Sequence, residues 1–422
     1  MIQNNNVPSI VNDSNGNDKG ISRQTSFLSG VTLHLIFVTM VDFIVRSAYM
    51  TGKTPVLPLF ADSLGAGEVY LGFISSISAF TGVILKPVIG TLSDRQGRRW
   101  WLFIGAGFFV LMPFVYRFIT TPEQLVAVRL IHGLATAIYG PVTMAMVVEM
   151  ADTNRASRVG IFSLGRSGGY ILGPALGGFL LLYMSAADVY TIIGLMSSVA
   201  LIPLVMLPET SAAFKSKKVK PNFWKQFVEN MRFSATTSAV WISSGFEAMN
   251  YMVTYSAKAF LPIYALAVGR NALEAGLFFS VQQAVAMSLK PLFGWLSDRW
   301  SHINIIFVAV LGMSSALFML TASANLAAFF AAAVLLGCTE AMIIPSATAL
   351  LAHQINDHSI GTGLGFVGSL RNLAKVGGPI IAGFIIAFTS YEATFNILGV
   401  VMLIAAFVLL YSKWRGLLLT EK

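Results

Sequence analysis

Long apolar stretches alternate along this chain with short polar or charged segments. A helix needs about 20 apolar residues to cross a hydrocarbon core of about 30 Å. The stretches lack the period-two alternation of a membrane β-barrel. The pattern therefore predicts an all-α membrane protein with twelve transmembrane helices. Their expected ranges are 28–52, 67–92, 101–120, 123–149, 159–183, 187–207, 236–266, 271–296, 303–322, 325–351, 360–387 and 391–413.

Composition supports a membrane protein and argues against an enzyme. Hydrophobic residues make up 55% of the 422 residues and charged residues only 11%, whereas soluble domains carry about 25% charged residues. The single Cys338 excludes an internal disulfide framework, and the five histidines lack zinc-site spacing. We expect neither metal nor cofactor. The sequence contains no Gly-x-Ser-x-Gly elbow and no His-Glu-x-x-His motif, so we do not expect enzymatic activity.

The net charge of +9 is concentrated in one set of loops. Of the 28 Lys and Arg residues, 17 lie in segments that we expect to be cytosolic, whereas the outer loops hold only Arg117 and Arg270. Basic loops mark the cytosolic face of a membrane protein. We therefore predict a multi-pass protein of a bacterial inner or plasma membrane with both termini in the cytosol. Nucleic acid is not an expected partner.

An internal repeat relates the two halves of the chain. Residues 85–95 return as residues 289–299, with eight of eleven positions identical at an offset of 204 residues. At an offset of 205, Arg166 matches Arg371. Because the offset spans six helices and a loop, the halves have parallel topology, and a solute site is expected near the midplane between them.

The repeat also predicts the domain organisation. The apolar residues of the linker fit either a short interfacial helix or a solvated basic loop. The expected segments are a disordered cytosolic tail (1–25), an N-terminal six-helix bundle (26–207), a cytosolic linker (208–235), a C-terminal six-helix bundle (236–413) and a cytosolic tail (414–422).

The loop between the second and third spans reads Gly90-Thr-Leu-Ser-Asp94-Arg95-Gln-Gly97-Arg98-Arg99. This loop resembles the corresponding motif of the major facilitator superfamily, and the resemblance extends over the chain after residue 25. It implies a conformational latch in which the acid binds the clustered arginines, while the glycines permit a tight turn. The second half keeps Asp298 and Arg299 but continues with Trp300 and Ser301, so we expect a weaker latch there. The alternative is that these charges only set topology.

Two further motifs resemble the same family. Arg129-Leu-Ile-His-Gly133 in the fourth span is similar to an intramembrane arginine motif linked with proton coupling. The fifth span is similar to the motif of twelve-helix drug/proton antiporters, which favours export. Its small and kinking residues allow close helix packing and a bend. The matching positions are Gly160, Gly169, Gly173, Pro174, Gly177 and Gly178.

Ionisable residues inside spans mark solute or proton paths, because burying charge in a bilayer is costly. Nine cations and four acids lie in spans that this family uses to line its cavity, a surplus of five positive charges. Arginine suits carboxylate or phosphate groups, so we predict an anionic solute. Lys86 and Lys290 have an alternative, since they can extend to the cytosolic surface. The candidate solute-binding residues are Arg46, Lys86, Arg166, Lys290, Arg371 and Lys375.

Four residues are candidates for proton coupling. Arg129 enters through the resemblance. Asp42 lies one helical turn from Arg46, and the two can form a static ion pair instead. Glu247 and Glu340 have no cation one turn away in their own helices. We favour these two acids without choosing between them.

The sequence as a whole predicts a proton-coupled secondary transporter that exports a small organic solute or drug, preferably an anion, by alternating access. Two alternatives remain open. One is a proton-coupled uptake symporter for an organic acid. The other is a non-transporting membrane binding or assembly protein of the same fold. The expected partners are the solute, protons and the lipid bilayer, and the chain is expected to be a monomer.

Overall fold

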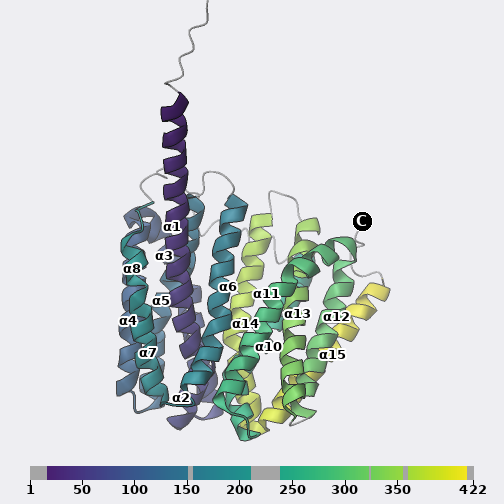
Figure 1. Cartoon of the computed structure of the whole chain (residues 1–422). Helices are drawn as coiled ribbons and strands as arrows, with labels where there is room; N and C mark the ends of the chain where they lie inside the picture. Colours follow the sequence, from purple (N-terminus) through teal and green to yellow (C-terminus); the bar gives the residue numbers. More distant parts are fainter. Residues whose placement is uncertain (1–16, 151–154, 211–237, 323–324, 355–359, 416–422) are drawn as a thin grey trace, which may run out of the picture.

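The computed structural model describes residues 17–150, 155–210, 238–322, 325–354 and 360–415, and these are almost entirely helical (Figure 1). The first half contains α1 (Asn17–Thr51), a π-helical turn (Gly52–Val56), α2 (Leu57–Ser63), α3 (Glu68–Gln96), α4 (Arg98–Val115), a 3-10 turn (Tyr116–Phe118), α5 (Pro122–Glu149), α6 (Arg155–Leu180), α7 (Ala186–Val199) and α8 (Leu201–Val205). The second half contains α10 (Ser238–Ala267), α11 (Ala272–Arg299), α12 (His302–Ala322), α13 (Leu326–Gln354), α14 (Ile360–Phe388) and α15 (Tyr391–Trp414).

Ten of the described helical segments are long and apolar enough to cross a membrane. The remaining long helices, α6 and α10, are more polar: Arg166 and several glycines lie in α6, and Glu247 and Lys258 lie in α10. With these two included, the described helices are consistent with twelve spans. The all-α membrane fold predicted from the sequence is confirmed.

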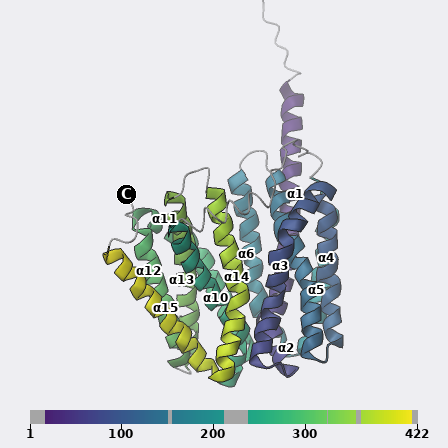
Figure 2. The same cartoon turned by 180° about the vertical axis from the view of Figure 1, so that it is seen from behind.

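The helices form two bundles that stand side by side, with α1–α8 in one and α10–α15 in the other (Figures 1 and 2). The start of α1 and the end of α15 lie at the same end of the molecule. We call the opposite end, where α2 lies, the α2 end. The predicted linker falls almost wholly outside the described residues.

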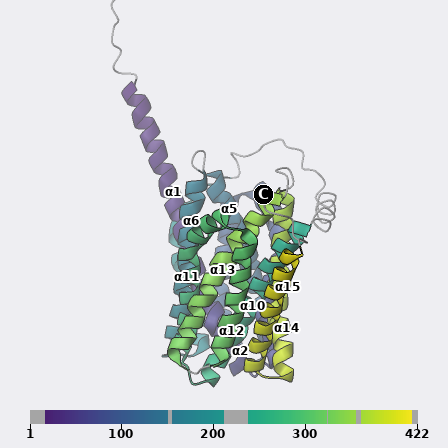
Figure 3. The same ribbon diagram turned by 90° about the vertical axis from the view of Figure 1, so that its right-hand side faces the viewer.

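One sequence expectation is wrong at the N-terminus. Residues 17–25 were expected to be disordered, yet α1 begins at Asn17 and extends beyond the ends of its neighbours (Figure 3). The physical reason is that a helix nucleated by a long apolar span grows by one backbone hydrogen bond per added residue, which costs little. Residues 1–16 lie outside the described part of the chain.

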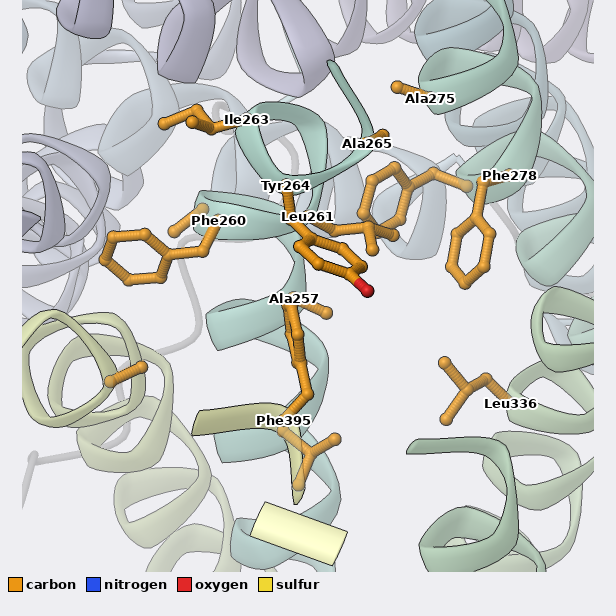
Figure 4. Close-up of a cluster of buried hydrophobic side chains, with 14 of the residues drawn as sticks. Ala257, Phe260, Leu261, Ile263, Tyr264, Ala265, Ala275, Phe278, Leu336 and Phe395 are labelled. Atoms are coloured by element: carbon orange, nitrogen blue, oxygen red, sulfur yellow. The ribbon is translucent and has the colours of Figure 1, made fainter. Parts of the chain in front are cut away.

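A buried apolar cluster joins the two bundles at the α2 end. It includes Leu57 and Leu71 of the first half and Phe260 and Phe278 of the second. Figure 4 shows the part around Phe260, Tyr264, Phe278 and Phe395. Because lipid tails are as apolar as these side chains, close van der Waals packing stabilises helix contacts in a membrane more than exclusion from water does.

Repeat-related glycines bring the bundles together in two helix crossings, α3 with α14 (Figure 2) and α6 with α11 (Figure 1). A Cβ atom on Gly72 would lie 2.5 Å from the carbonyl oxygen of Pro379, and one on Gly276 would lie 2.2 Å from that of Pro174. Beside the first of these contacts, Ser76 donates a hydrogen bond of 2.7 Å to a backbone carbonyl of α14. Backbone therefore meets backbone between the halves, with no room for side chains.

Candidate functional site

A cavity of about 460 Å³ begins one turn beyond these crossings, on the side away from the α2 end. Helices α1, α3, α5, α6, α10 and α14 line it together with the π-helical turn after α1, so both halves contribute. Five of its lining residues are cationic and none is acidic. The lining residues are Arg46, Tyr49, Lys53, Ser78, Ala79, Gly82, Lys86, Thr136, Gly140, Pro141, Met144, Arg166, Tyr170, Tyr255, Asn372 and Lys375.

A buried carboxylate of the first half holds one of the lining arginines. Arg166 donates two hydrogen bonds to Asp42, each of 2.9 Å, in a bidentate pair. The hydroxyl of Thr143 contacts the same carboxylate at 3.3 Å, and Arg46 lies 3.6 Å from it, at a distance that allows the ion pair considered as an alternative for Asp42. The Asp42 side chain is fully buried. Its charge is therefore balanced by two guanidinium groups.

The second half repeats this arrangement. Arg371 donates a hydrogen bond of 2.8 Å to Glu247. The two acids, like the two arginines, are separated by the repeat offset of 205 residues, so each half holds the same pair with a spacing of 124 residues. Neither pair was predicted from the sequence, because each joins two helices and the spacing within a single helix does not reveal it. The equal spacing in the two halves is the signal that could have found them.

The third predicted acid also has a partner on a neighbouring helix. Lys290 of α11 donates a hydrogen bond of 3.1 Å to Glu340 of α13. Glu247 and Glu340 have no cation one turn away in their own helices, as the sequence indicated, but each pairs with a cation of a neighbouring helix. In the described structure, all three candidate acids are therefore in ion pairs.

The predicted solute-binding cations fall into two groups. Arg46, Lys86, Arg166 and Lys375 line the cavity, whereas Lys290 and Arg371 are held by acids and do not belong to its lining. The ammonium of Lys86 lies 3.7 Å from the position that a Cβ on Gly82 would occupy, one turn back along α3. It therefore points into the cavity and not toward the C-terminal end of α3.

Arg129 lies outside this cavity. The residue is buried beside an aromatic cluster in which the Tyr116 hydroxyl contacts His132 Nδ1 at 3.2 Å and the rings of Tyr116 and Tyr190 stack. Its Nε and Nη2 atoms have no hydrogen-bond partner among the described residues. The structure does not bring Arg129 together with the candidate acids.

The predicted latch is centred on Arg98. Its guanidinium binds Glu149 at 2.8 Å, Ser93 at 2.6 Å and also Asp94. Glu209, which the sequence analysis did not assign to the latch, accepts hydrogen bonds from the first backbone N–H groups of α4, where a helix dipole favours an anion. These contacts join α3, α4, α5 and the segment after α8 within one half. In the second half, Arg299 instead stacks on the Trp295 ring at 4.2 Å.

The turn of the latch requires glycine. Gly97 has φ of +111°, a backbone conformation that disfavours any side chain. A Cβ there would also lie 2.5 Å from the Glu209 carboxylate. The sequence motif is therefore explained by both conformation and space.

The glycine motif of α6 packs this helix against two neighbours. Cβ atoms on Gly173 and Gly177 would overlap Met50 and Thr51 of α1, and one on Gly178 would lie 2.3 Å from the Ala272 carbonyl of the other half. Gly160 has open space around its Cβ position. Most of the motif thus permits close packing of α6, and one member contributes to the contact between the halves.

Comparisons with known proteins agree with this architecture. Residues 35–314 and 240–416 match the sequence family described as Major Facilitator Superfamily. The chain is 24% identical to the Staphyloferrin B transporter of Staphylococcus aureus (strain NCTC 8325 / PS 47), over 86% of this chain and 89% of that protein. It is 25% identical to the Multidrug resistance protein MdtG of Proteus mirabilis (strain HI4320), over 85% and 90%. The crystal structure of nucleoside transporter NupG superposes with a TM-score of 0.78 at 12% identity, over 90% and 98%, which establishes a shared fold.

Proposed function

The chain belongs to the major facilitator superfamily and is a membrane transporter, not an enzyme, and we propose that it exports a small organic anion by proton-coupled alternating access. Both halves contribute to the cavity, and the crossings at the α2 end close it on one side. With the basic loops cytosolic, this conformation faces the cytosol. The solute would enter the cavity there and leave after the crossings separate.

The charge of the cavity carries the proposal. Its lining includes Arg46, Lys53, Lys86, Arg166 and Lys375 and no acid. Asp42 offsets one of these five charges through Arg46 and Arg166, while Glu247 and Glu340 are bound by Arg371 and Lys290, which lie outside the lining. A low-dielectric site with uncompensated positive charge attracts anions and repels cationic drugs. We therefore favour an anionic solute.

Two observations favour export. The glycine motif of α6 resembles that of drug/proton antiporters, and relatives of this chain include proteins named for multidrug resistance and efflux. One relative is named as a transporter of staphyloferrin B. These names belong to the relatives. For this chain they support the direction of transport more than the identity of the solute.

The ion pairs favour a second candidate, proton-coupled uptake of an organic acid. An anion that displaces Asp42 from Arg166, or Glu247 from Arg371, leaves a carboxylate free to bind a proton. Anion and proton would then bind together, and an inward proton gradient would drive inward transport. Proton linkage is thus proposed in either case, and the direction distinguishes the two.

Reconstitution tests the proposed function. Purified protein in proteoliposomes is given an imposed pH gradient and matched anionic, neutral and cationic solutes. We expect flux of anionic solutes that depends on the gradient, with protons moving opposite to the solute for export and with it for uptake. Flux of cationic solutes alone would contradict the proposal.

Topology gives a first prediction. A fluorescent protein fused after Lys422 should fluoresce, and alkaline phosphatase at the same position should be inactive, because the basic loops keep this end in the cytosol. Fusions after Arg117 should show the opposite pattern. An active phosphatase after Lys422 would overturn the proposed orientation and the cytosol-facing assignment.

The latch gives a second prediction. Asp94→Asn should lower the transport rate about tenfold while solute affinity changes by less than about twofold, since the change alters the balance of conformations and leaves the cavity intact. Rates come from proteoliposome flux and affinities from calorimetry. Asp62→Asn, an exposed acid at the α2 end, is the matched control. Unchanged rates in Asp94→Asn would argue that these charges only set topology.

A further inference from the structure

We propose that Lys53, Lys258 and Lys375 form a subsite at the floor of the cavity for a multivalent oxyanion, such as a polycarboxylate or a phosphate group. The inference rests on the proposed function and specifies its solute class: the solute carries at least two negative charges at one end. Lys53 and Lys258 were outside the candidate set derived from the sequence.

Three ammonium groups surround one aromatic ring. The Nζ atoms of Lys53, Lys258 and Lys375 lie 4.8, 5.5 and 5.6 Å from the ring centroid of Tyr255. Lys375 also lies 4.3 Å from the Tyr251 ring. Contacts with aromatic faces lower the free-energy cost of burying a cation but supply no negatively charged group to pair with it. Three basic side chains are therefore gathered at one ring that supplies no counter-charge.

The repeat places two of these lysines as counterparts. Lys53 and Lys258 are separated by the offset of 205 residues that also relates Arg166 to Arg371. One follows α1 and the other lies in α10, so the two halves present equivalent ammonium groups to the same ring. An oxyanion between them would contact both halves at once and hold them together near the closed end.

No carboxylate of the described residues forms an ion pair with any of the three lysines. The acids of this region are engaged elsewhere, Asp42 by Arg166 and Arg46, and Glu247 by Arg371. Like charges in a low-dielectric site repel strongly unless an anion or water meets them. A single carboxylate balances one lysine, which is why a multivalent group fits this cluster better.

A small side pocket of about 10 Å³ adds an independent observation. It lies between the cavity floor and the crossing of α3 with α14, and its lining includes Lys53, Thr54, Ser75, Tyr255 and Lys258. The hydroxyls of Thr54 and Ser75 are buried there without a hydrogen-bond partner among the described residues, and Thr54 is fully buried. Such groups are normally satisfied. The space suits about one oxygen atom, which would accept hydrogen bonds from the two hydroxyls, with the positive charges of Lys53 and Lys258 beside it.

Calorimetric binding to the full-length protein in nanodiscs tests the subsite. The probes are citrate, inorganic phosphate, acetate and choline, each at the same ionic strength. We expect citrate or phosphate to bind at least about tenfold more tightly than acetate, and choline not to bind, because attraction grows with the charge of the probe. The comparison of citrate with phosphate distinguishes polycarboxylate from phosphate chemistry.

Variants locate the binding. Lys53→Gln and Lys258→Gln should each lower the affinity for the tighter-binding probe by at least about tenfold, which is the loss expected when a charged hydrogen-bond donor is removed. Thr54→Val combined with Ser75→Ala keeps every charge and should lower the affinity for the same probe by about threefold or more. Lys413→Gln, an exposed lysine of α15, is the matched control and should bind normally. Thermal melting checks that each variant is folded.

The outcomes separate this inference from the proposed function. Tight binding of citrate or phosphate that survives both lysine variants and the hydroxyl variant would overturn the subsite. An affinity for acetate equal to that for citrate or phosphate would also overturn the subsite. In either case, anion flux in proteoliposomes would leave the proposed function standing. Flux of cationic solutes alone, with choline bound and the oxyanions not bound, would overturn both.

Discussion

Gly276→Val is expected to lower transport at least about hundredfold, because alternating access requires the α2 end to close in one half of the cycle. A Cβ at this position would lie 2.2 Å from the carbonyl oxygen of Pro174 and 3.2 Å from Gly178 Cα. Both are backbone atoms, which cannot rotate away as a side chain can. The halves would have to separate by moving whole helices.

The repeat supplies a second variant with the same mechanism. Gly72→Val would place its Cβ 2.5 Å from the carbonyl oxygen of Pro379. Gly160→Val, which belongs to the α6 motif but has open space around it, is the control. We expect it to retain transport within about threefold, since a β-branched residue costs a helix only a few tenths of a kcal/mol.

Flux in proteoliposomes gives the first measurement and labelling gives the second. In a Cys338→Ser background, a cysteine at Ser75 should be protected from a membrane-impermeant maleimide added from the outside. Gly276→Val should expose it by opening the crossings. Normal flux and continued protection in Gly276→Val would mean that this contact is not a gate.

The fold was largely predictable because its signals are local. A hydropathy pattern identifies each span, and residues 85–95 repeat in register as residues 289–299, which predicts six helices per half and their parallel topology. Both signals depend only on order along the chain. The start of α1 was misplaced because the polarity of a tail does not determine where a nucleated helix stops.

The site was less predictable because it depends on how helices rotate about their axes. In a membrane this rotation follows from packing of small residues and not from an amphipathic pattern alone. Asp42 therefore pairs with Arg166 on α6 as well as with Arg46 on its own helix. The glycines of α6 allow this helix to pack closely against α1. For the same reason, the sequence shows that Lys53 and Lys258 lie within spans or at their ends but does not indicate that both contact the ring of Tyr255.

Neutralising one acid of the repeat-related pairs is expected to abolish gradient-driven transport. Glu247→Gln leaves Arg371 without its carboxylate, and no proton can bind at this position. Accumulation of solute driven by a pH gradient should be lost, while exchange of solute across a membrane without a gradient continues. Proteoliposome assays of accumulation and of exchange measure the two separately.

A stability comparison distinguishes coupling from a structural role. Removing one partner of a fully buried ion pair costs about 3–5 kcal/mol, chiefly because the other charge is left unpaired. The cost should approach this range for Asp42→Asn, whose carboxylate is fully buried, and be smaller for Glu247→Gln, whose partner Arg371 is 36% exposed.

The double variant Glu247→Gln/Arg371→Gln decides between the roles, because it removes both charges and leaves none unpaired. It should recover most of the stability that Glu247→Gln loses in thermal melting. If the acid carries the proton, accumulation stays absent in the stable double variant while exchange without a gradient continues, which shows that solute still binds without Arg371. If the pair is only structural, accumulation returns with stability. Gradient-driven accumulation that persists in Asp42→Asn, Glu247→Gln and Glu340→Gln taken singly would exclude all three acids as proton carriers.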